Sequence, residues 1–226
     1  MDTNEADREL KDYYRRRAPV YDDVYTYPER QDDLRFLEQY VSRQFDGNDV
    51  IEIAAGTGYW TQFVSQRART ILAMDITQEA LAQIKGRHIT CPIQTRVSDA
   101  YALDDIEEGF DGAFAGLWFS HIPLKRQREW LQMLHSRLDP GSTVLLLDNS
   151  AAQCEQWPVT STDEDGNTFQ ERTTNSGERF SVLKNFPGEA ELVELIAGLG
   201  HDHQFRQLDH FWLFQYVTNH NLAVTG

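Results

Sequence analysis

The chain of 226 residues is predicted to be an α/β protein with a mostly parallel sheet and helices on both of its faces. Between residues 49 and 149, apolar strand-like segments alternate with helical ones, which is typical of a parallel sheet covered on both sides. Hydrophobic residues make up 40% of the chain and aromatic residues 12%, which is enough for an extensive core. Glycine or polar residues follow the strand-like segments, where ligands of such sheets bind.

The N-terminal segment is predicted to be helical. Leu34, Leu37, Tyr40 and Val41 recur at helical spacing, and Pro28 is suited to a helix start. The segment before them, YYRRRAPVYDDVY, is rich in tyrosine. Residues 1–46 therefore precede the sheet as a helical unit.

Five strands and three helices are predicted in the alternating part. The strands lie in DVIEIA (49–54), TILAMD (70–75), PIQTRVSDA (92–100), FDGAFAGLWFS (110–120) and STVLLLDN (142–149). The helices lie in YWTQFVSQ (59–66), TQEALAQIKG (77–86) and LKRQREWLQMLHSRL (124–138). Thr77 is a natural N-cap, Gly86 a stop, and 139–141 a chain break.

The C-terminal part departs from this alternation. GNTFQERTTNSGERFSV (166–182) is predicted to form a two-stranded hairpin that turns at 175–177. A helix in EAELVELIAGLG follows, and HQFRQLDHFWLFQYV contains two antiparallel strands. No repeat or linker interrupts the chain, so residues 1–226 are predicted to form one domain, with an insertion at 150–186.

Charge and cysteine content indicate a cytoplasmic protein that avoids nucleic acids and membranes. The chain has 21 basic and 36 acidic residues, a net charge of −15, which would repel both partners. Its acidic N-terminus lacks the features of a signal peptide, and no apolar run is long enough for a membrane span. Cys91 and Cys154 have no metal-ligand spacing and are expected to be free thiols.

The glycine turn after the first strand favours a cationic ligand. A dinucleotide fingerprint requires a third glycine, but Thr61 stands there. Glu52 lies within the strand, where a carboxylate suits an amino group or a sulfonium and not a pyrophosphate. Asp75, at the end of the second strand, can accept both hydroxyls of a ribose, and Asp99 can accept an exocyclic adenine amine.

In the order of its motifs, the chain resembles class I S-adenosylmethionine (SAM)-dependent methyltransferases. The motifs are VIEIAAGTG, MD and SDA, followed by WFSHIP and the late strand HFWLFQYV. The resemblance covers nearly the whole chain and indicates a small-molecule member similar to methyltransferase domains of types 11 and 25. It implies a Rossmann-like sheet of seven strands with the last strand antiparallel, SAM as cofactor and S-adenosylhomocysteine (SAH) as product.

The resemblance also implies cofactor contacts. Glu52 would hold the methionine amino group through water, and Asp75 the ribose, with Ile76 beside it. Asp99 would bind the adenine amine, with Ala100 adjacent.

Three further positions belong to the glycine turn. Gly56 and Gly58 would let the backbone approach the cofactor. Ala54 stands where the family has its first glycine; we expect it to narrow this approach at little cost.

The N-terminal unit resembles the lid of small-molecule members. Tyr14, Arg17 and Tyr21 are the candidates to cover the methionine carboxylate, although each arginine could equally lie on a solvated helix face. The insertion at 150–186 could fold over the acceptor pocket or form a dimer interface. Within it, Arg172 and Arg179 could bind an acidic acceptor or form a surface pair.

His121 is the candidate general base. It follows the fourth strand, where the acceptor is expected, and its ordinary pKa near 6.5 suits neutral pH. The alternative is a structural histidine at the turn. Trp118 could wall the cofactor or pack in the core. No metal is expected at His201 and His203, a segment that we interpret as a loop.

The leading hypothesis is methyl transfer from SAM to a small-molecule acceptor at O, N, S or carbon, by a monomer or homodimer. The first alternative is an NAD-type oxidoreductase, which Glu52 and Thr61 disfavour. The second is a catalytically silent SAM-fold binding module.

Overall fold

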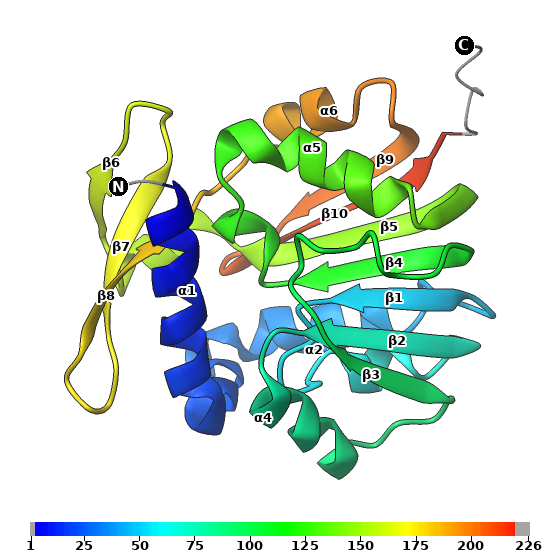
Figure 1. Ribbon diagram of the computed structural model, residues 1–226, viewed down its shortest axis with the longest axis horizontal. Helices are drawn as coiled ribbons and strands as arrows, with labels where there is room; N and C mark the ends of the chain where they lie inside the picture. The colour runs from blue at the N-terminus through cyan, green and yellow to red at the C-terminus, as the bar shows by residue number, and fades with distance from the viewer. Residues whose placement is uncertain (1–2, 220–226) are drawn as a thin grey trace.

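The computed structural model describes residues 3–219 and confirms the predicted α/β class (Figure 1). A seven-stranded sheet has the order β3-β2-β1-β4-β5-β10-β9, and a three-stranded sheet has the order β6-β7-β8. The first five strands are parallel to their neighbours and β10 is antiparallel to β5, as predicted for the last strand.

The elements have the following bounds. The large sheet contains β1 (Asp49–Ile53), β2 (Thr70–Asp75), β3 (Ile93–Val97), β4 (Phe110–Gly116), β5 (Leu138–Asn149), β9 (Gly200–Gln207) and β10 (Phe211–Thr218). The small sheet contains β6 (Val159–Thr162), β7 (Thr168–Thr173) and β8 (Arg179–Leu183). The α-helices are α1 (Thr3–Arg17), α2 (Gln31–Val41), α3 (Thr61–Val64), α4 (Gln78–Leu81), α5 (Leu124–His135) and α6 (Glu189–Ile196). Short 3-10 helices are η1 (Ala18–Tyr25), η2 (Pro28–Arg30), η3 (Ala82–Gly86), η4 (Phe119–His121) and η5 (Ala151–Glu155).

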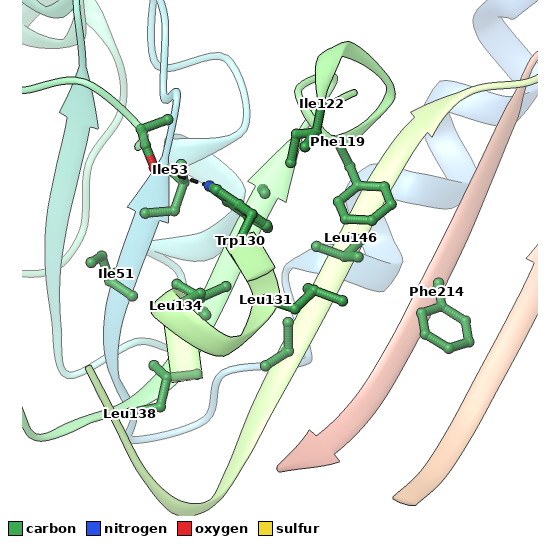
Figure 2. Packing of buried hydrophobic residues seen from close by; sticks show 14 of the residues in the cluster. Ile51, Ile53, Phe119, Ile122, Trp130, Leu131, Leu134, Leu138, Leu146 and Phe214 are labelled. Carbon is green, nitrogen blue, oxygen red and sulfur yellow. Dashed lines mark hydrogen bonds between the residues drawn. The ribbon is translucent and has the colours of Figure 1, made fainter. Parts of the chain in front are cut away.

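Two apolar layers cover the faces of the large sheet. Helices α5 and α6 pack on one face, and α2, α3 and α4 on the other, because neighbouring strand residues point to opposite faces. Ile51 packs with Trp130 of α5, whereas Val50 packs on the α2 side. Figure 2 shows Trp130 in the first layer, where its indole Nε1 donates a hydrogen bond to the carbonyl of Ala100 at 2.9 Å.

The structure corrects three details of the secondary-structure prediction. The insertion has a third strand, β6, whose residues are all exposed and therefore show no hydrophobic alternation. Segment 201–203 lies in β9 and not in a loop; this edge strand pairs only with β10 and tolerates a polar composition. The helices after β1 and β2 are single turns, and β5 begins four residues early, at Leu138.

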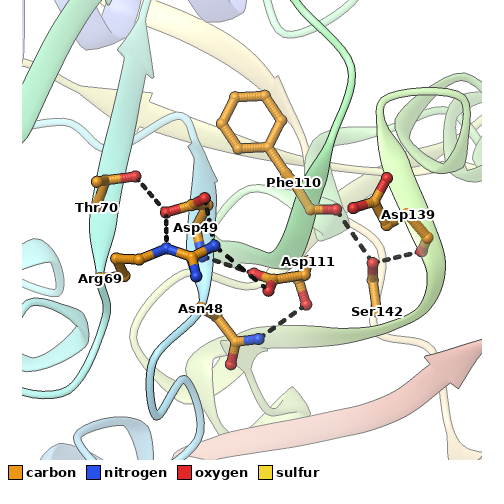
Figure 3. Close-up of polar contacts among 8 residues, drawn as sticks. All are labelled: Asn48, Asp49, Arg69, Thr70, Phe110, Asp111, Asp139 and Ser142. Carbon is orange, nitrogen blue, oxygen red and sulfur yellow. Dashed lines mark hydrogen bonds and ion pairs between the residues drawn. The ribbon is translucent and has the colours of Figure 1, made fainter.

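Polar contacts hold the amino ends of the strands in register, at the edge opposite the predicted site (Figure 3). The Asp49 carboxylate accepts hydrogen bonds from Arg69 Nε and Thr70 Oγ1 at 2.8 Å each, which joins β1 to β2. The backbone N–H of Asp49 donates to Asp111 Oδ1 at 2.6 Å, which joins β1 to β4. The carboxyl ends of the strands are thereby left for ligand binding.

Elements of the N-terminal unit and the insertion stand beyond those carboxyl ends, where Figure 1 shows α1 between the large sheet and the small one. Glu9 of α1 accepts a hydrogen bond from the backbone N–H of Ser181 in β8 at 2.7 Å. Arg16 forms an ion pair with Glu178 at 2.6 Å. Helix α1 and the insertion therefore support each other. Whether the whole chain is one domain stays a prediction.

The turn after β1 is built from residues with left-handed backbone conformation. Ala54, Gly56 and Gly58 have φ values of 54°, 56° and 78°. For Ala54 this conformation has an energetic cost, because its Cβ approaches the backbone. A Cβ on Gly58 would lie 2.6 Å from Cγ1 of Ile84 in η3, so Gly58 permits the packing of η3 on the turn.

Opposite substitutions in this turn should have opposite effects on stability. We expect Ala54→Gly to raise the free energy of unfolding by about 0.5–1 kcal/mol, because relief of left-handed strain exceeds the added entropy of the unfolded chain. Gly58→Ala should lower it by more than about 1 kcal/mol, through strain and the contact with Ile84. Urea denaturation measures both, and destabilisation by Ala54→Gly would contradict the strain argument.

Candidate active site

A cavity lies at the carboxyl ends of the parallel strands, beneath α1, whose Leu10, Lys11 and Tyr14 line it. We call it the first cavity. Ten of the thirteen predicted site residues line it: Tyr14, Tyr21, Ala54, Gly56, Asp75, Ile76, Asp99, Ala100, Trp118 and His121. Glu52, Gly58 and Arg17 do not line it; Glu52 and Gly58 lie behind the turn, and Arg17 faces a second cavity.

Asp75 connects the end of β2 with the glycine turn. Its Oδ2 accepts a hydrogen bond from the Gly56 N–H at 2.9 Å, and its Oδ1 accepts from the Thr77 N–H at 2.8 Å. Burial raises the pKa of this carboxyl, and the backbone donors oppose the rise. Hydrogen bonds from the Thr77 side chain and the Ile76 N–H also oppose the rise in pKa, and the Asp75 side chain lines the cavity.

Glu52 is almost completely buried, at 1% exposure, with Asp75 and Thr61 as polar neighbours. Its Oε2 has no hydrogen-bond partner among the described residues. Burial raises the pKa of Glu52 to about 8, with a smaller contribution from the charge of Asp75. The carboxyl group is therefore protonated at neutral pH unless a cation lies nearby.

Helix α1 closes the cavity through an ion pair. Lys11 Nζ lies 2.6 Å from Asp99 Oδ2, and both side chains are about one-third exposed, at 32% and 30%. Asp99 Oδ1 accepts a hydrogen bond from the Tyr101 N–H at 3.1 Å, which holds the carboxylate at the cavity wall. Exposed pairs of this kind contribute little to stability, so the lid can open at small cost.

His121 is buried and both of its ring nitrogens are engaged. Nδ1 lies 2.6 Å from the carbonyl oxygen of Leu183 in β8, which can only accept, so Nδ1 carries the proton. Nε2 then accepts a hydrogen bond from the Tyr14 hydroxyl at 2.7 Å. Burial raises the pKa of Tyr14 well above its ordinary value, so this phenol stays protonated.

The pKa of His121 departs from the value on which its prediction rested. Burial, followed by the positive charge of Lys184, lowers the pKa of His121 to about 3. The imidazole is neutral at pH 7 and accepts a hydrogen bond from the Tyr14 hydroxyl. It becomes protonated only at low pH. The premise of an ordinary pKa near 6.5 is therefore wrong, and a role as general base stays a prediction.

A buried ion pair joins β5 to the insertion. Lys184 Nζ lies 2.7 Å from Asp148 Oδ1, and the two side chains are 2% and 0% exposed. Burial would raise the pKa of Asp148, but the Lys184 charge, together with the hydrogen bonds from Lys184 and Ser120 and a smaller charge effect of His121, lowers it below its ordinary value. Asp148 Oδ2 also accepts from the Ser120 N–H at 2.9 Å, which ties this pair to η4.

A second cavity adjoins the first, and Tyr14, Tyr21 and Leu117 line both. Arg17 and Arg172 line the second cavity. Arg17 NH1 donates to the Tyr13 hydroxyl at 2.6 Å, and its guanidinium lies 5.9 Å from the ring centre of Tyr21.

The two arginines of the hairpin, for which the sequence left two interpretations open, have different environments. Arg172 is buried, at 6% exposure, and faces the second cavity. Arg179 is exposed and forms a surface pair with Glu171 at 3.5 Å. The structure therefore places Arg172 in the wall of the second cavity and Arg179 in a surface ion pair.

Several site residues were missed by sequence reasoning. Lys11 and Arg30 were read as parts of helices, and Lys184 lay within the insertion without a motif. Leu117 has a φ of 59°, rare for a non-glycine residue, and separates the two cavities. The sequence signal that could have identified Lys184 is a charged residue in an otherwise apolar segment. No sequence signal distinguishes Leu117.

Membrane spans, metal sites and disulfides were also considered for the described residues. Among the described helices, none is long and apolar enough to cross a membrane. Within residues 3–219, no group of three His, Cys, Asp or Glu side chains is arranged as a metal site would require. Cys91 and Cys154 are free thiols.

Two solved structures that are similar to this chain are complexes with SAH or SAM. A family model described as "Methyltransferase domain" matches residues 50–141. The structure titled "DhpI-SAH complex structure" has a TM-score of 0.78 and 26% identity, with 96% of this chain and 98% of that chain covered. The chain is a class I SAM-dependent methyltransferase. Its cofactor is SAM, and the NAD-type alternative is set aside.

Further structures agree with this assignment. The "DhpI-SAM-HEP complex" has a TM-score of 0.75 and 26% identity, over 94% of this methyltransferase and 97% of that chain. The PH0226 protein from Pyrococcus horikoshii OT3 shares the fold, with a TM-score of 0.68 and 16% identity over 92% and 99% of the two chains. No curated protein matches the chain.

The burial of Glu52 predicts a pH-dependent stability of the free methyltransferase. Its pKa rises from 4.5 in the unfolded chain to about 8 in the fold. Between these pH values the folded protein retains a proton that the unfolded chain releases, so the free energy of unfolding falls as pH rises, by up to about 5 kcal/mol. Glu52→Gln removes this titration, so its stability relative to wild type should grow from pH 5 to pH 8.

Urea denaturation at pH 5, 7 and 9 measures this difference. Glu79→Gln, a change at an exposed glutamate, is the matched control and should parallel wild type. If Glu52→Gln also parallels wild type at every pH, the carboxyl group is not held neutral by burial.

Proposed function

We propose that this methyltransferase transfers the SAM methyl group to a small-molecule acceptor at an O, N, S or C nucleophile, by in-line displacement that releases SAH. The observation that carries the proposal is the position of α1, which covers the carboxyl ends of the strands (Figure 1). Its Lys11 is held to Asp99 at 2.6 Å, and its Tyr14 forms a wall of both cavities. A site roofed by a helix suits a small molecule.

The donor set of the first cavity fits SAM. We propose that Asp75, which lines the first cavity, accepts hydrogen bonds from the ribose hydroxyls, and that Ile76 lies beside the nucleoside. Asp99 would accept the adenine amine on the side that Lys11 does not occupy, with Ala100 adjacent. All of these residues line the same cavity, which supports a single nucleoside site.

The turn after β1 would hold the amino-acid part. Ala54 and Gly56 present their backbone to the cavity, and Gly58 supports the turn from behind by packing on Ile84. Glu52, whose Oε2 has no partner, is the buried acceptor that an ammonium would engage through water. A cation there lowers the pKa of a neighbouring carboxyl, so we expect cofactor binding to release the proton of Glu52.

Lid residues complete the cofactor site. Tyr14 and Tyr21 would cover the methionine end, and Trp118 lines the same cavity. Arg17 would act through its contact with Tyr21 and not through the first cavity.

The sulfonium of the bound cofactor supplies an activated methyl group. The chain mainly has to align the acceptor, and alignment can lower a barrier by about 7–11 kcal/mol. We propose that His121 contributes to catalysis through Tyr14, whose hydroxyl it orients at 2.7 Å. A base is required only where the acceptor must lose a proton.

Removal of either member of this pair should slow turnover. We expect Tyr14→Phe and His121→Ala each to lower kcat by about 100-fold, and the double variant to be no slower than the slower single one, because the two residues act as a unit. SAH affinity, measured by calorimetry, should change little. Tyr40→Phe, whose hydroxyl contacts Gln215 away from the site, is the control. Wild-type turnover in both single variants would remove the pair from the mechanism.

The cofactor assignment of Asp75 is tested by binding. SAH should bind and NAD should not. Asp75→Ala should weaken SAH at least tenfold, because it removes charged hydrogen bonds of about 1.5–3 kcal/mol each. Asp111→Ala, at the opposite edge of the sheet (Figure 3), is the matched control. Unchanged SAH affinity in Asp75→Ala would mean that the ribose binds elsewhere. Turnover of methyl-labelled SAM with a small-molecule extract tests the acceptor class.

We also propose that the enzyme works in the cytoplasm as a monomer or homodimer. The two free thiols support a reducing compartment. The net charge of −15 disfavours nucleic acid as the acceptor.

A further inference from the structure

The second cavity is strongly basic in an acidic protein. Three arginines, Arg17, Arg30 and Arg172, line it together with Lys184. They come from α1, η2, β7 and the end of β8, so the cluster is formed by the fold and not by a run of basic sequence. The chain as a whole carries a net charge of −15. A random distribution of charge would not gather four cations around one buried space.

Among residues 8–219, the arginines of this cavity have no counter-ion. Lys184 is neutralised by Asp148 at 2.7 Å, but no carboxylate of these residues lies within 4.0 Å, the ion-pair distance, of Arg17, Arg30 or Arg172. The positive charges lie close enough to act on one another: burial lowers the pKa of Arg172, and the charges of Arg17 and Arg30 lower it further. The cavity therefore holds an excess of three positive charges.

Arg172 and Arg30 are both buried, at 6% and 5% exposure, and held in place by neutral groups. Arg172 NH2 donates to Gln170 Oε1 at 2.6 Å and to Gln153 Oε1 at 3.2 Å, and its guanidinium lies 3.9 Å from the ring centre of Trp157.

Arg30 NH2 reaches Gln156 Oε1 at 3.5 Å, and its guanidinium lies 4.7 Å from the ring centre of Tyr27.

Each of these two arginines keeps an unused donor. The Nε atoms of Arg30 and Arg172 are buried and have no hydrogen-bond partner among the described residues. A buried charge without a partner is costly, and a guanidinium presents five donors in a planar fork that matches an oxyanion. The cost is recovered when an oxyanion enters the cavity.

The second cavity lies where a methyl acceptor has to be. It shares Tyr14, Tyr21 and Leu117 with the first cavity, so a ligand in it would lie next to the methionine end of the cofactor. We propose, on the basis of the small-molecule transfer proposed above, that the acceptor is a small acid whose oxyanion, a carboxylate or a phosphoryl group, binds Arg30 and Arg172 in the second cavity. Arg17 adds long-range attraction at the boundary between the cavities.

The test measures binding of simple oxyanions to the SAH-saturated protein. Acetate, methylphosphonate and inorganic phosphate are titrated by calorimetry at constant ionic strength, with chloride as the balancing anion. We expect saturable binding of at least one of them at one site per chain. The tighter of acetate and methylphosphonate identifies the carboxylate or the phosphoryl class.

Variants locate that site. Arg172→Gln and Arg30→Gln should each weaken oxyanion binding at least tenfold and leave SAH affinity within about threefold of wild type, since neither residue lines the first cavity. Arg179→Gln, on the neighbouring strand of the same hairpin but exposed, is the matched control and should bind as wild type. Arg172→Lys keeps the charge without the fork and should be intermediate.

The outcomes separate the two proposals. Absence of saturable oxyanion binding in wild-type protein that binds SAH, or wild-type oxyanion affinity in both glutamine variants, overturns the acidic acceptor and leaves methyl transfer standing. Failure of wild type to bind SAH would instead overturn the proposed function. If Arg172→Gln loses SAH binding through misfolding, Arg30→Gln and Arg172→Lys decide the question.

Discussion

The buried ion pair between Asp148 and Lys184 is the contact on which the arrangement of the site depends. Neither charge is accessible to water, and a buried charge left alone would destabilise the fold by several kcal/mol. The pair therefore obliges the end of β8 to lie against the end of β5. The same contact brings the Leu183 carbonyl to His121 at 2.6 Å and carries Arg172, through β7, to the second cavity. The insertion thus lines the second cavity with Arg172 and Lys184.

The two cavities have opposite electrostatic character. Asp75 and Asp99 line the first one, with Glu52 behind its wall, so this side favours a cation such as a sulfonium with its ammonium. The second one carries the unpaired charges of Arg30 and Arg172. A positively charged methyl donor and a negatively charged acceptor would be drawn to different sides of one boundary. In a space with little water, both attractions are stronger than they would be at the surface. For the acceptor proposed above, the charges of the two cavities would orient both reactants before methyl transfer.

The sequence predicts those site residues whose position follows from the local pattern of strand and turn. Asp75 and Asp99 end apolar strands, so their type and position already indicated a nucleoside, and both line the cavity. The same reasoning could not tell Arg172 from Arg179, because two arms of a hairpin look alike until a partner covers one face. Sequence reasoning also missed Arg30. This residue lines the second cavity only because η2 and β7, which are about 140 residues apart in the sequence, come together around it. For these arginines, packing between distant segments, and not residue type, determines which side chain lines the cavity.

The environment of His121 agrees with an acceptor that arrives already ionised. Its Nδ1 proton is fixed by the Leu183 carbonyl, so only Nε2 is available, and Nε2 is occupied by the Tyr14 hydroxyl. With a pKa of about 3, the ring is a weak base, because burial and the nearby Lys184 disfavour its cation. Transfer to a neutral hydroxyl would require a stronger base, whereas a carboxylate or phosphoryl oxygen has no proton to lose at pH 7. A neutral histidine that orients a phenol is sufficient for such an acceptor. Arg172, which is proposed to hold the oxyanion, also lowers the pKa of His121, after burial and Lys184, so this arginine links the proposed binding site to the neutral state of the imidazole.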